Sequence, residues 1–485
     1  MRKGLWVACA VSLGGCSALG PDYERPPLEV PGHWRLDPAQ TSELVNGAWW
    51  EQFGDPQLNT LIGIALDENR DLRIAVARVE EYLGRYGATR ADQFPQVAAG
   101  ADAGHGRTAE SQRLPGSAAT ASQFDVNLGA SFELDLWGRL RRATEAAQAD
   151  LLAQQEARQT VVLTLVSSVA NAYISLRELD QRLTITRTTL QSRAESMHLA
   201  QRRFEVGLTP ELDARQAESE YESTRAMVPQ LEQAIVQQEN ALSLLLGRNP
   251  GPIVRGRTLV ELRRPVVPAG LPSDLIERRP DIRQAEQQLV AANAQIGIAR
   301  AAYFPVVSLT GALGSVSPQL SSLFGGPARA WSYGAGLSVP VFTAGKIAGQ
   351  VQAAEAVQQQ TLENYRKTVQ TAFAEVENAL VAASKTSEQL EAQARQVEAL
   401  RSYLRLARLR YDNGYTSYLE VLDAERNLFS AELSLAQTRG SELSTLVNLY
   451  KAMGGGWVDE AARRSTLVSP GVAGAPPSAT ATRGT

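Results

Sequence analysis

The stretch FDVNLGASFELDL, from Phe124 to Leu136, alternates apolar and polar residues without a break. Because successive side chains of a β-strand point to opposite faces, the pattern predicts a strand with one apolar and one polar face. WSYGAGLSVPV, from Trp331 to Val341, repeats the alternation. Partner strands are expected after two Phe-Pro pairs. The four predicted strands therefore cover about 95–104, 123–137, 305–314 and 330–342.

The chain carries this pattern twice because it is internally duplicated. RFEVGLTPELDARQAES, at 203–219, recurs as RYDNGYTSYLEVLDAER at 410–426, an offset of 207 residues. Gly207 and Gly414 stand at the same place in the two copies, in a turn between two predicted helices. Self-similarity over this length predicts two structural repeats, at 57–247 and 273–454, joined by a linker at 248–272.

Two helices are predicted to be unusually long. Residues 139–204 contain neither Pro nor Gly, and the same holds from 350 to 413, so each helix spans about 65 residues, or roughly 100 Å. Apolar residues in both follow coiled-coil spacing, which indicates helices packed lengthwise, in a coiled coil or a bundle. Shorter helices are expected at 57–92, 210–246, 273–302 and 417–453, with a kink at Pro229.

Four strands leave the predicted sheet with two open edges. A soluble antiparallel sheet packed on a core would show the same alternation. A membrane sheet must be closed, since unpaired edges are not tolerated in hydrocarbon, and the smallest closed bacterial barrels use eight strands. No run of about 18 apolar residues follows the N-terminal segment, so we expect any membrane crossing to be made by strands. Two or three chains would then pool eight or twelve strands.

The N-terminus has the features of a lipoprotein signal peptide. A basic start and a short apolar run end in LGGC, Leu13 to Cys16, which resembles a lipobox. This predicts a signal peptide at 1–15, acylation of Cys16, and an extended segment at 16–56. An ordinary secretory signal and an unmodified cysteine are the alternatives. The C-terminal 455–485 is expected to be largely disordered.

Composition argues against several functional classes. The net charge of −4 gives no footprint for nucleic acid. The three histidines, His33, His105 and His198, share no ligand spacing, and no phosphate loop or nucleophile motif occurs. We therefore expect a protein that is not an enzyme, with no cofactor, no catalytic residue and no metal site.

The chain resembles the TolC-like outer-membrane efflux channels, in the lipoprotein branch that works with resistance-nodulation-division pumps. The resemblance rests on the lipobox followed by GPDYERP and on the motifs WWEQFGDPQLNTLI, FELDLWGR, ERRPDIRQAEQQLVAANAQIGIARAAYFP, RYDNGYTSYLEVLDAER and LYKAMGGGW. It implies a mainly α-helical homotrimer with a shared twelve-stranded membrane β-barrel and a periplasmic α-helical tunnel. A periplasmic adaptor protein and an inner-membrane transporter are the implied partners. The channel itself would be passive and would reside in the outer membrane of a Gram-negative bacterium.

The resemblance also implies a periplasmic gate at the second hairpin. Carried over by position, its residues are Tyr411, Leu419, Asp423 and Arg426. Asp423 and Arg426 lie three apart on one helix face, so they could pair within a chain or across the threefold axis. The first copy has Gln216 and Ser219 at these positions. A solvated surface ion pair is the alternative interpretation.

Two other functions are compatible with parts of the pattern. The same kind of channel could serve type I protein secretion, although the lipobox and the ERRPDIRQAE motif favour small-molecule efflux. A structural coiled-coil lipoprotein that tethers envelope layers would need the helices, but it would not need the alternating strands.

Overall fold

The computed structural model describes residues 18–35, 48–113, 115–116, 118–265 and 272–455. The predicted signal peptide, Cys16 and nearly all of the predicted tail lie outside these residues. The described chain forms two compact units. Unit 1 comprises 1–29, 76–157 and 281–369, and unit 2 comprises 30–75, 158–280 and 370–485. Each is described by itself below.

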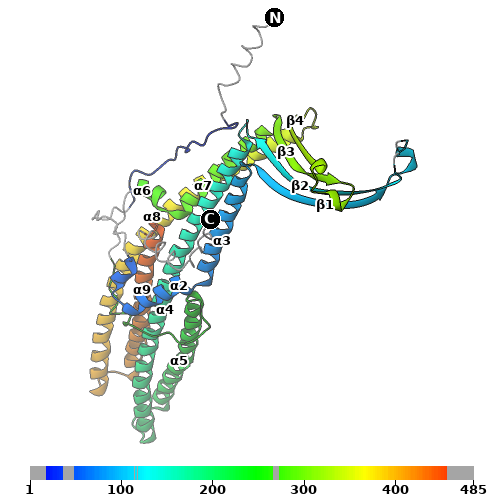
Figure 1. Cartoon of the computed structure of the whole chain (residues 1–485). Coiled ribbons are helices and arrows are strands. Elements are labelled where there is room, and N and C mark those ends of the chain that lie inside the picture. The colour runs from blue at the N-terminus through cyan, green and yellow to red at the C-terminus, as the bar shows by residue number, and fades with distance from the viewer. Residues whose placement is uncertain (1–17, 36–47, 114, 117, 266–271, 456–485) are drawn as a thin grey trace, which may run out of the picture. The chain divides into compact units, whose positions relative to one another are not determined.

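The order of elements repeats between the two halves of the chain (Figure 1). The first half contains η1 (Trp49–Phe53), α2 (Pro56–Glu68), α3 (Arg70–Ala91), β1 (Gln96–Arg107), η2 (Glu110–Gln112), β2 (Thr120–Leu134), α4 (Arg139–Glu205) and α5 (Glu211–Leu245). The second contains α6 (Pro272–Arg278), α7 (Pro280–Ala301), β3 (Val306–Ser317), η3 (Leu320–Ser322), η4 (Gly326–Ala328), β4 (Arg329–Ser338), α8 (Lys346–Asp412) and α9 (Tyr418–Ala452).

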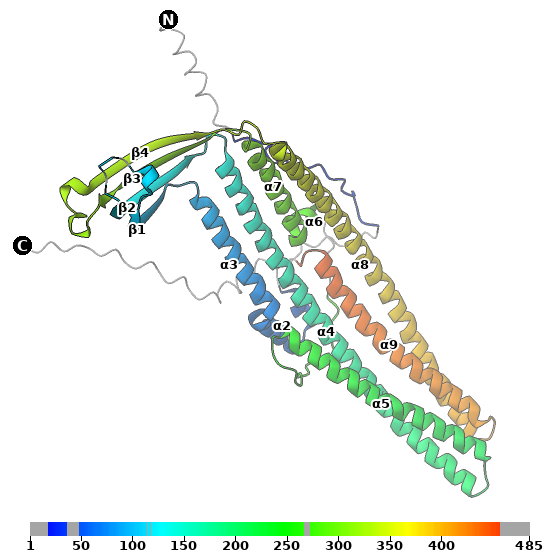
Figure 2. The same cartoon turned by 90° about the vertical axis from the view of Figure 1, so that its right-hand side faces the viewer.

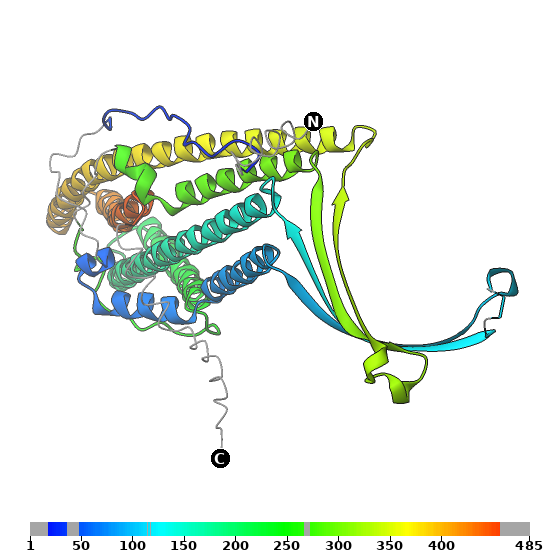
Figure 3. The same cartoon turned by 45° about the horizontal axis from the view of Figure 1, so that its top comes forward.

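Unit 1 carries one antiparallel sheet in the order β1-β2-β3-β4 (Figure 3). The central β2–β3 pair joins the two repeats, with Leu128 opposite Leu313 and Ala130 opposite Gly311. Leu128 and Val126 are exposed on the predicted apolar face. Among the described strands, β1 and β4 each have one neighbour, so each leaves an unpaired edge.

The ends of the strands differ from the predicted ones by a few residues. β4 stops at Ser338, short of the expected 342, because Pro340 has no N–H to donate to a ladder. β2 stops at Leu134, since the Asp135 carboxylate accepts hydrogen bonds from the backbone N–H groups of Leu140 (3.1 Å) and Arg141 (2.9 Å). These bonds satisfy free donors at the start of α4 and turn the chain from strand to helix.

α4 and α8 have 67 residues each, which corresponds to about 100 Å of helix. Two shorter helices that we expected to be continuous are broken. Asn69 separates α2 from α3, where its Oδ1 accepts from the N–H of Leu72 at 2.9 Å and caps the second helix. Arg279 separates α6 from α7, because the following Pro280 disfavours a helical residue before it. α5 runs through Pro229 without ending.

Unit 2 contains a large hydrophobic core around the middle of α4. Its buried side chains include Val162, Val166, Val169, Tyr173 and Ile174 of α4, with Trp49, Phe53, Leu242 and Tyr450 from other elements. Among the described residues, one stretch of α4 is long and apolar enough to cross a membrane by length and composition alone. The stretch is 56% buried inside the protein, because its apolar side chains supply this core.

The buried carboxylate of Asp55 connects the described part of the linker after α5 to this core through hydrogen bonds. Asp55 is fully buried, and it accepts hydrogen bonds from the Tyr173 hydroxyl (2.7 Å) and the N–H of Arg257 (2.9 Å). It also caps α2 through the N–H of Gln57. The carboxylate thereby joins the first repeat to the described part of the linker.

Candidate functional site: the ends of the two helical hairpins

In unit 2, α4 turns into α5 and α8 turns into α9, which gives two helical hairpins (Figure 2). Gly207 and Gly414 have φ of 72° and 75°, in the left-handed region that favours glycine. The N–H of Leu208 donates to the Arg203 carbonyl at 2.8 Å, and that of Tyr415 donates to the Arg410 carbonyl at 2.9 Å. Both are Schellman caps, so the two copies end their long helices in the same way.

Near these turns the hairpins share a small apolar cluster. Its buried residues are Ala200, Ala217, Ala407, Tyr418, Val421, Leu422 and Ala424. Four of the seven are alanines, whose short side chains let helix backbones approach closely. A cavity of about 140 Å³ lies beside the cluster and is lined by residues of α4, α8 and α9. Hairpin-to-hairpin packing here is therefore close and rests on small side chains.

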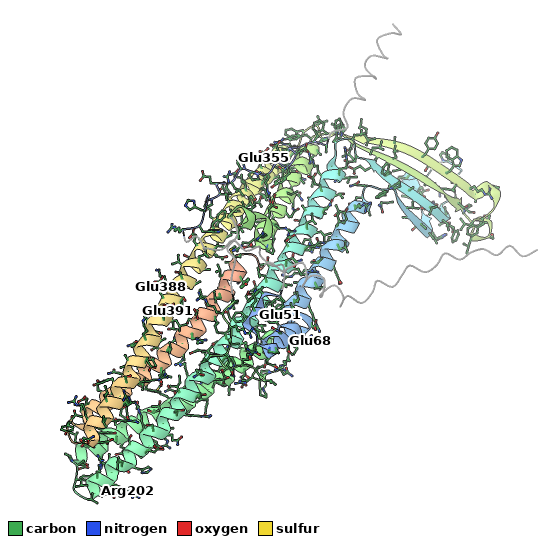
Figure 4. The ribbon with its side chains drawn as sticks, turned by 90° about the vertical axis from the view of Figure 1, so that its left-hand side faces the viewer. Glu51, Glu68, Arg202, Glu355, Glu388 and Glu391 are labelled. Carbon is green, nitrogen blue, oxygen red and sulfur yellow. The ribbon has the colours of Figure 1, made fainter. Side chains whose placement is uncertain are left out.

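Tyr411 connects the two hairpins directly. Its hydroxyl oxygen accepts a hydrogen bond from Arg203 Nη1 of α4 at 2.9 Å. The same guanidinium lies 5.3 Å from the centroid of the Tyr411 ring, within the range of a cation–π interaction. Arg202, the neighbour of Arg203, marks this end of α4 in Figure 4. The ring of Tyr418 lies 5.4 Å from that of Tyr411, so the link continues into α9.

Asp423 and Arg426 do not pair with each other within one chain. Asp423 is exposed and accepts from Asn427 Nδ2 at 3.1 Å. Arg426 Nε instead donates to Glu220 Oε1 of α5 at 2.6 Å. The expected pairing within a chain is thus replaced by a link between hairpins, because packing brings α5 beside α9. The hydrogen bond to Glu220 raises the pKa of Arg426.

Glu220 and Arg193 also belong to this site, although the sequence pattern did not predict either of them. Arg193 of α4 pairs with Glu220 Oε2 at 2.9 Å, and its side chain is only 6% exposed. Its guanidinium also lies 5.2 Å from the ring of Phe429 in α9. Burial lowers the pKa of Arg193, and the carboxylates of Glu220 and Glu425 oppose that shift. Glu220 thus holds one buried and one exposed arginine, from two different hairpins.

A sequence signal for Glu220 exists, although it is weak. Ala214, Ala217, Glu220 and Thr224 are all buried and follow helical spacing, which makes Glu220 the one charged residue in a stripe of small side chains. A charge in such a stripe is rarely buried without a partner. The identity of the partners depends on the packing of α4, α5 and α9, which the stripe alone does not reveal.

The remaining predicted residues have simpler surroundings. Leu419 is 57% exposed. Glu420, which has an acidic counterpart in Asp213, pairs with Arg410 at 2.8 Å in the first turn of α9. Burial, followed by the charge of Glu425, raises the pKa of Tyr418 to about 12. Within the described residues there is no group of three or more His, Cys, Asp or Glu that could hold a metal ion.

The fold and these hairpins define a class of membrane channel, and comparisons with known proteins identify it. The family model described as outer membrane efflux protein matches residues 61–248 and 271–455. The toluene efflux pump outer membrane protein TtgC of Pseudomonas putida is 40% identical over 468 residues, 95% of this chain and 96% of the relative. A probable outer membrane lipoprotein of Salmonella typhimurium, SilC, is 38% identical over 94% of this chain and 99% of the relative.

Solved structures agree with these sequence matches. A crystal structure of CusC has a TM-score of 0.82 and 37% identity, covering 90% of this chain and 100% of that one. The open state of the MtrE outer membrane channel of Neisseria gonorrhoeae has a TM-score of 0.83 and 34% identity, covering 91% and 99%. The chain belongs to the outer membrane efflux protein family. It is an outer-membrane component of an efflux pump, so efflux is favoured over protein secretion and over a purely structural role.

Family membership also fixes the fold class. The chain is mainly α-helical and internally duplicated, and it has the fold of the trimeric channels CusC and MtrE. In that fold, four strands from each of three chains make one twelve-stranded barrel, and the long helices make a periplasmic tunnel. The open edges of β1 and β4 are the surfaces that such closure requires. The prediction of a shared barrel is confirmed, with three chains rather than two.

Proposed function

We propose that this chain is a lipid-anchored homotrimeric exit duct, acylated at Cys16, that works with a periplasmic adaptor and an inner-membrane resistance-nodulation-division transporter. Its cargo would be small apolar or amphiphilic molecules, the class suggested by relatives named for toluene, solvent and antibiotic efflux. The duct is passive, and the transporter supplies the energy.

The proposed gate lies at the second hairpin, with Tyr411, Leu419, Asp423 and Arg426 as its residues. The observation that carries the proposal is the set of links between hairpins, Arg203–Tyr411 and Glu220–Arg426. If α8 and α9 move outward as a pair, both links must break, whereas contacts inside each hairpin can persist. The Schellman caps at Gly207 and Gly414 keep each hairpin intact during such a movement.

The tips beside Gly207 and Gly414 are the proposed docking points for the adaptor. Three apolar residues of the first tip are exposed, Val206, Leu208 and Leu212, and Tyr415 is 77% exposed at the second. Exposed apolar side chains on adjacent turns are typical of a protein–protein contact.

Cross-linking in cells tests this arrangement. We expect Leu208→Cys and Tyr415→Cys, carrying a short photoreactive cross-linker, to capture the adaptor protein when the cognate pump is expressed. Leu320→Cys is a matched control, because Leu320 is 64% exposed but lies in the loop between β3 and β4. Capture from position 320 alone, or from none of the three in a strain whose efflux is intact, would contradict docking at the tips.

A further inference from the structure

We propose that a cavity in unit 2, between the two helical hairpins, binds a small molecule that combines an apolar ring system with one anionic group. The cavity has a volume of about 400 Å³, and residues of α4, α8 and α9 line it together with Leu259 and Val260 of the linker. Sites for drug-sized ligands usually measure about 300–1,000 Å³. The inference does not depend on the position of the gate.

The cavity lies between two places where α4 and α9 are in contact. At Gly440 of α9 a Cβ would lie 3.0 Å from the Cβ of Glu178, so the two helices approach closely there. Nearer the turns, the Arg193 guanidinium of α4 lies 5.2 Å from the centroid of the Phe429 ring. The lining residues of both helices fall between these contacts along the chain, where the short side chain of Ala436 leaves space. The cavity therefore belongs to the way in which the two hairpins pack.

The walls of the cavity are mainly apolar and come from both repeats. The apolar lining residues on α4, the linker, α8 and α9 include Ile185, Leu259, Leu390, Leu435 and Ala436. Leu259 is only 1% exposed, so the linker forms a fixed part of the wall. Apolar walls favour an apolar ligand, because binding removes apolar surface from water. A flat ring system suits a space between helices better than a strongly hydrated molecule does.

Arg439 of α9 is a lining cation that pairs with no carboxylate among the described residues. Its Nη2 donates to the Val260 carbonyl at 3.0 Å and its Nε to the Leu259 carbonyl at 3.4 Å. Glu442, three residues further along α9, pairs with Arg264 instead, at 3.5 Å. The positive charge of Arg439 is therefore balanced only by the dipoles of two carbonyl groups. A ligand carboxylate or sulfonate would accept a charge-assisted hydrogen bond from this guanidinium.

The acidic residues of the lining offer less to a cationic ligand. Glu432 already pairs with Arg401 at 2.8 Å. The side chain of Glu391, which Figure 4 labels on α8, is 71% exposed, so water solvates its charge. Arg439 is partly buried, and a charge that is less exposed to water interacts more strongly with a ligand. The charges of the lining therefore favour an anion.

Calorimetry with three ligands that share one ring system tests the proposal. Naphthalenesulfonate, naphthylmethanol and naphthylmethylammonium are each titrated into the full-length trimer in nanodiscs, with empty nanodiscs as the baseline. We expect the sulfonate to bind about tenfold more tightly than the alcohol or more, because it gains a hydrogen bond to a charged group. The ammonium compound should bind more weakly than the sulfonate.

Two substitutions of Arg439 test the role of its charge. Arg439→Gln keeps a hydrogen-bond donor and should lower the affinity for the sulfonate by about tenfold, while the affinity for the alcohol stays the same. Arg439→Lys keeps the positive charge and should retain part of the preference for the sulfonate. Equal affinities of the wild type for all three ligands, or a preference for the ammonium compound, would overturn the anionic assignment.

Filling the cavity tests its location. Ala394 of α8 lines the cavity and is exposed, so Ala394→Phe should block the site without disturbing a buried core, and it should abolish binding of the sulfonate. Ala392→Phe is the matched control, because Ala392 is also exposed on α8 but does not line the cavity. It should leave binding unchanged. Equal binding by both variants, or no binding of the sulfonate to the wild type up to about 1 mM, would overturn the proposed site.

Discussion

Glu220 should contribute far more than Arg426 to the stability of the packed hairpins, although the two residues form one ion pair. Replacing Glu220 by Gln keeps the shape but leaves the buried Arg193 guanidinium without its ion-pair partner. Removing one partner of a buried pair costs about 3 kcal/mol or more. Replacing Arg426 by Gln leaves Glu220 paired with Arg193. Because the Arg426 side chain is 53% exposed, its loss should cost at most about 1 kcal/mol.

Hydrogen exchange, measured by mass spectrometry on the reconstituted trimer, gives the loss of stability that each substitution causes in each segment of the chain. Where amides exchange through local opening, a tenfold change in rate corresponds to about 1.4 kcal/mol. Glu220→Gln should therefore speed exchange of the amides in residues 213–228 by about 150-fold, and Arg426→Gln by about fivefold at most. The amides around the middle of α4, in the large core, should be unaffected in both variants.

Glu232→Gln is the control for removing a carboxylate from α5. Glu232 pairs with Arg187 of α4 at 2.7 Å, but both side chains are about half exposed. We expect it to behave like Arg426→Gln. Equal acceleration by Glu220→Gln and Glu232→Gln would refute the reasoning, because it would mean that burial of Arg193 does not determine the cost.

Three further predictions address other parts of the molecule. Tyr411→Phe removes the hydroxyl that accepts a hydrogen bond from Arg203 but keeps the ring. Single-channel recording should therefore show a smaller rise in conductance for Tyr411→Phe than for Tyr411→Ala. Equal rises in the two variants would mean that the ring contributes nothing. Tyr418 has a folded pKa of about 12 against an ordinary 10.0, so its contribution to the free energy of unfolding is complete below pH 10 and is lost as the pH rises to 12. Hydrogen exchange should therefore show that the hairpin in Tyr418→Phe loses less stability than the wild-type hairpin over this pH range. An identical pH dependence in the two proteins would contradict this prediction. Leu128→Arg places a charge on the apolar face of β2 and should cost about 2–4 kcal/mol of barrel stability, which gels would show as loss of the trimer band. Asn127→Arg, on the polar face, should be tolerated. The opposite result for the two variants would mean that the two faces are assigned the wrong way round.

Local features of the fold could be predicted from the sequence because they depend on local physics. The alternation from Phe124 to Leu136 gives the phase of β2, and Gly207 and Gly414 mark helix ends through their left-handed φ. The break at Asn69 was missed because Asn69 caps one helix and also donates to the Leu245 carbonyl at 2.9 Å. That second contact spans 176 residues and has no local signal.

The site was predicted less completely, for a related reason. The duplication pointed to Asp423 and Arg426, since the other copy has Gln216 and Ser219 there. The spacing of the two charges suggested that they pair with each other, but Arg426 binds Glu220, 206 residues away. The spacing of residues along one helix does not show whether a charged residue on a neighbouring helix competes as the ion-pair partner. A partly buried carboxylate that already faces a second arginine is the more favourable partner.

The most direct test of the gate is a planar-bilayer recording of the purified trimer. We expect the wild type to conduct weakly and Asp423→Ala with Arg426→Ala to conduct several times more, because the charges of the proposed gate and the link to Glu220 are both removed. Gln216→Ala, at the matching place in the first copy, should leave the conductance at the wild-type value. Equal conductance in the wild type and the double variant, or an equal rise from Gln216→Ala, would contradict a gate at the second hairpin.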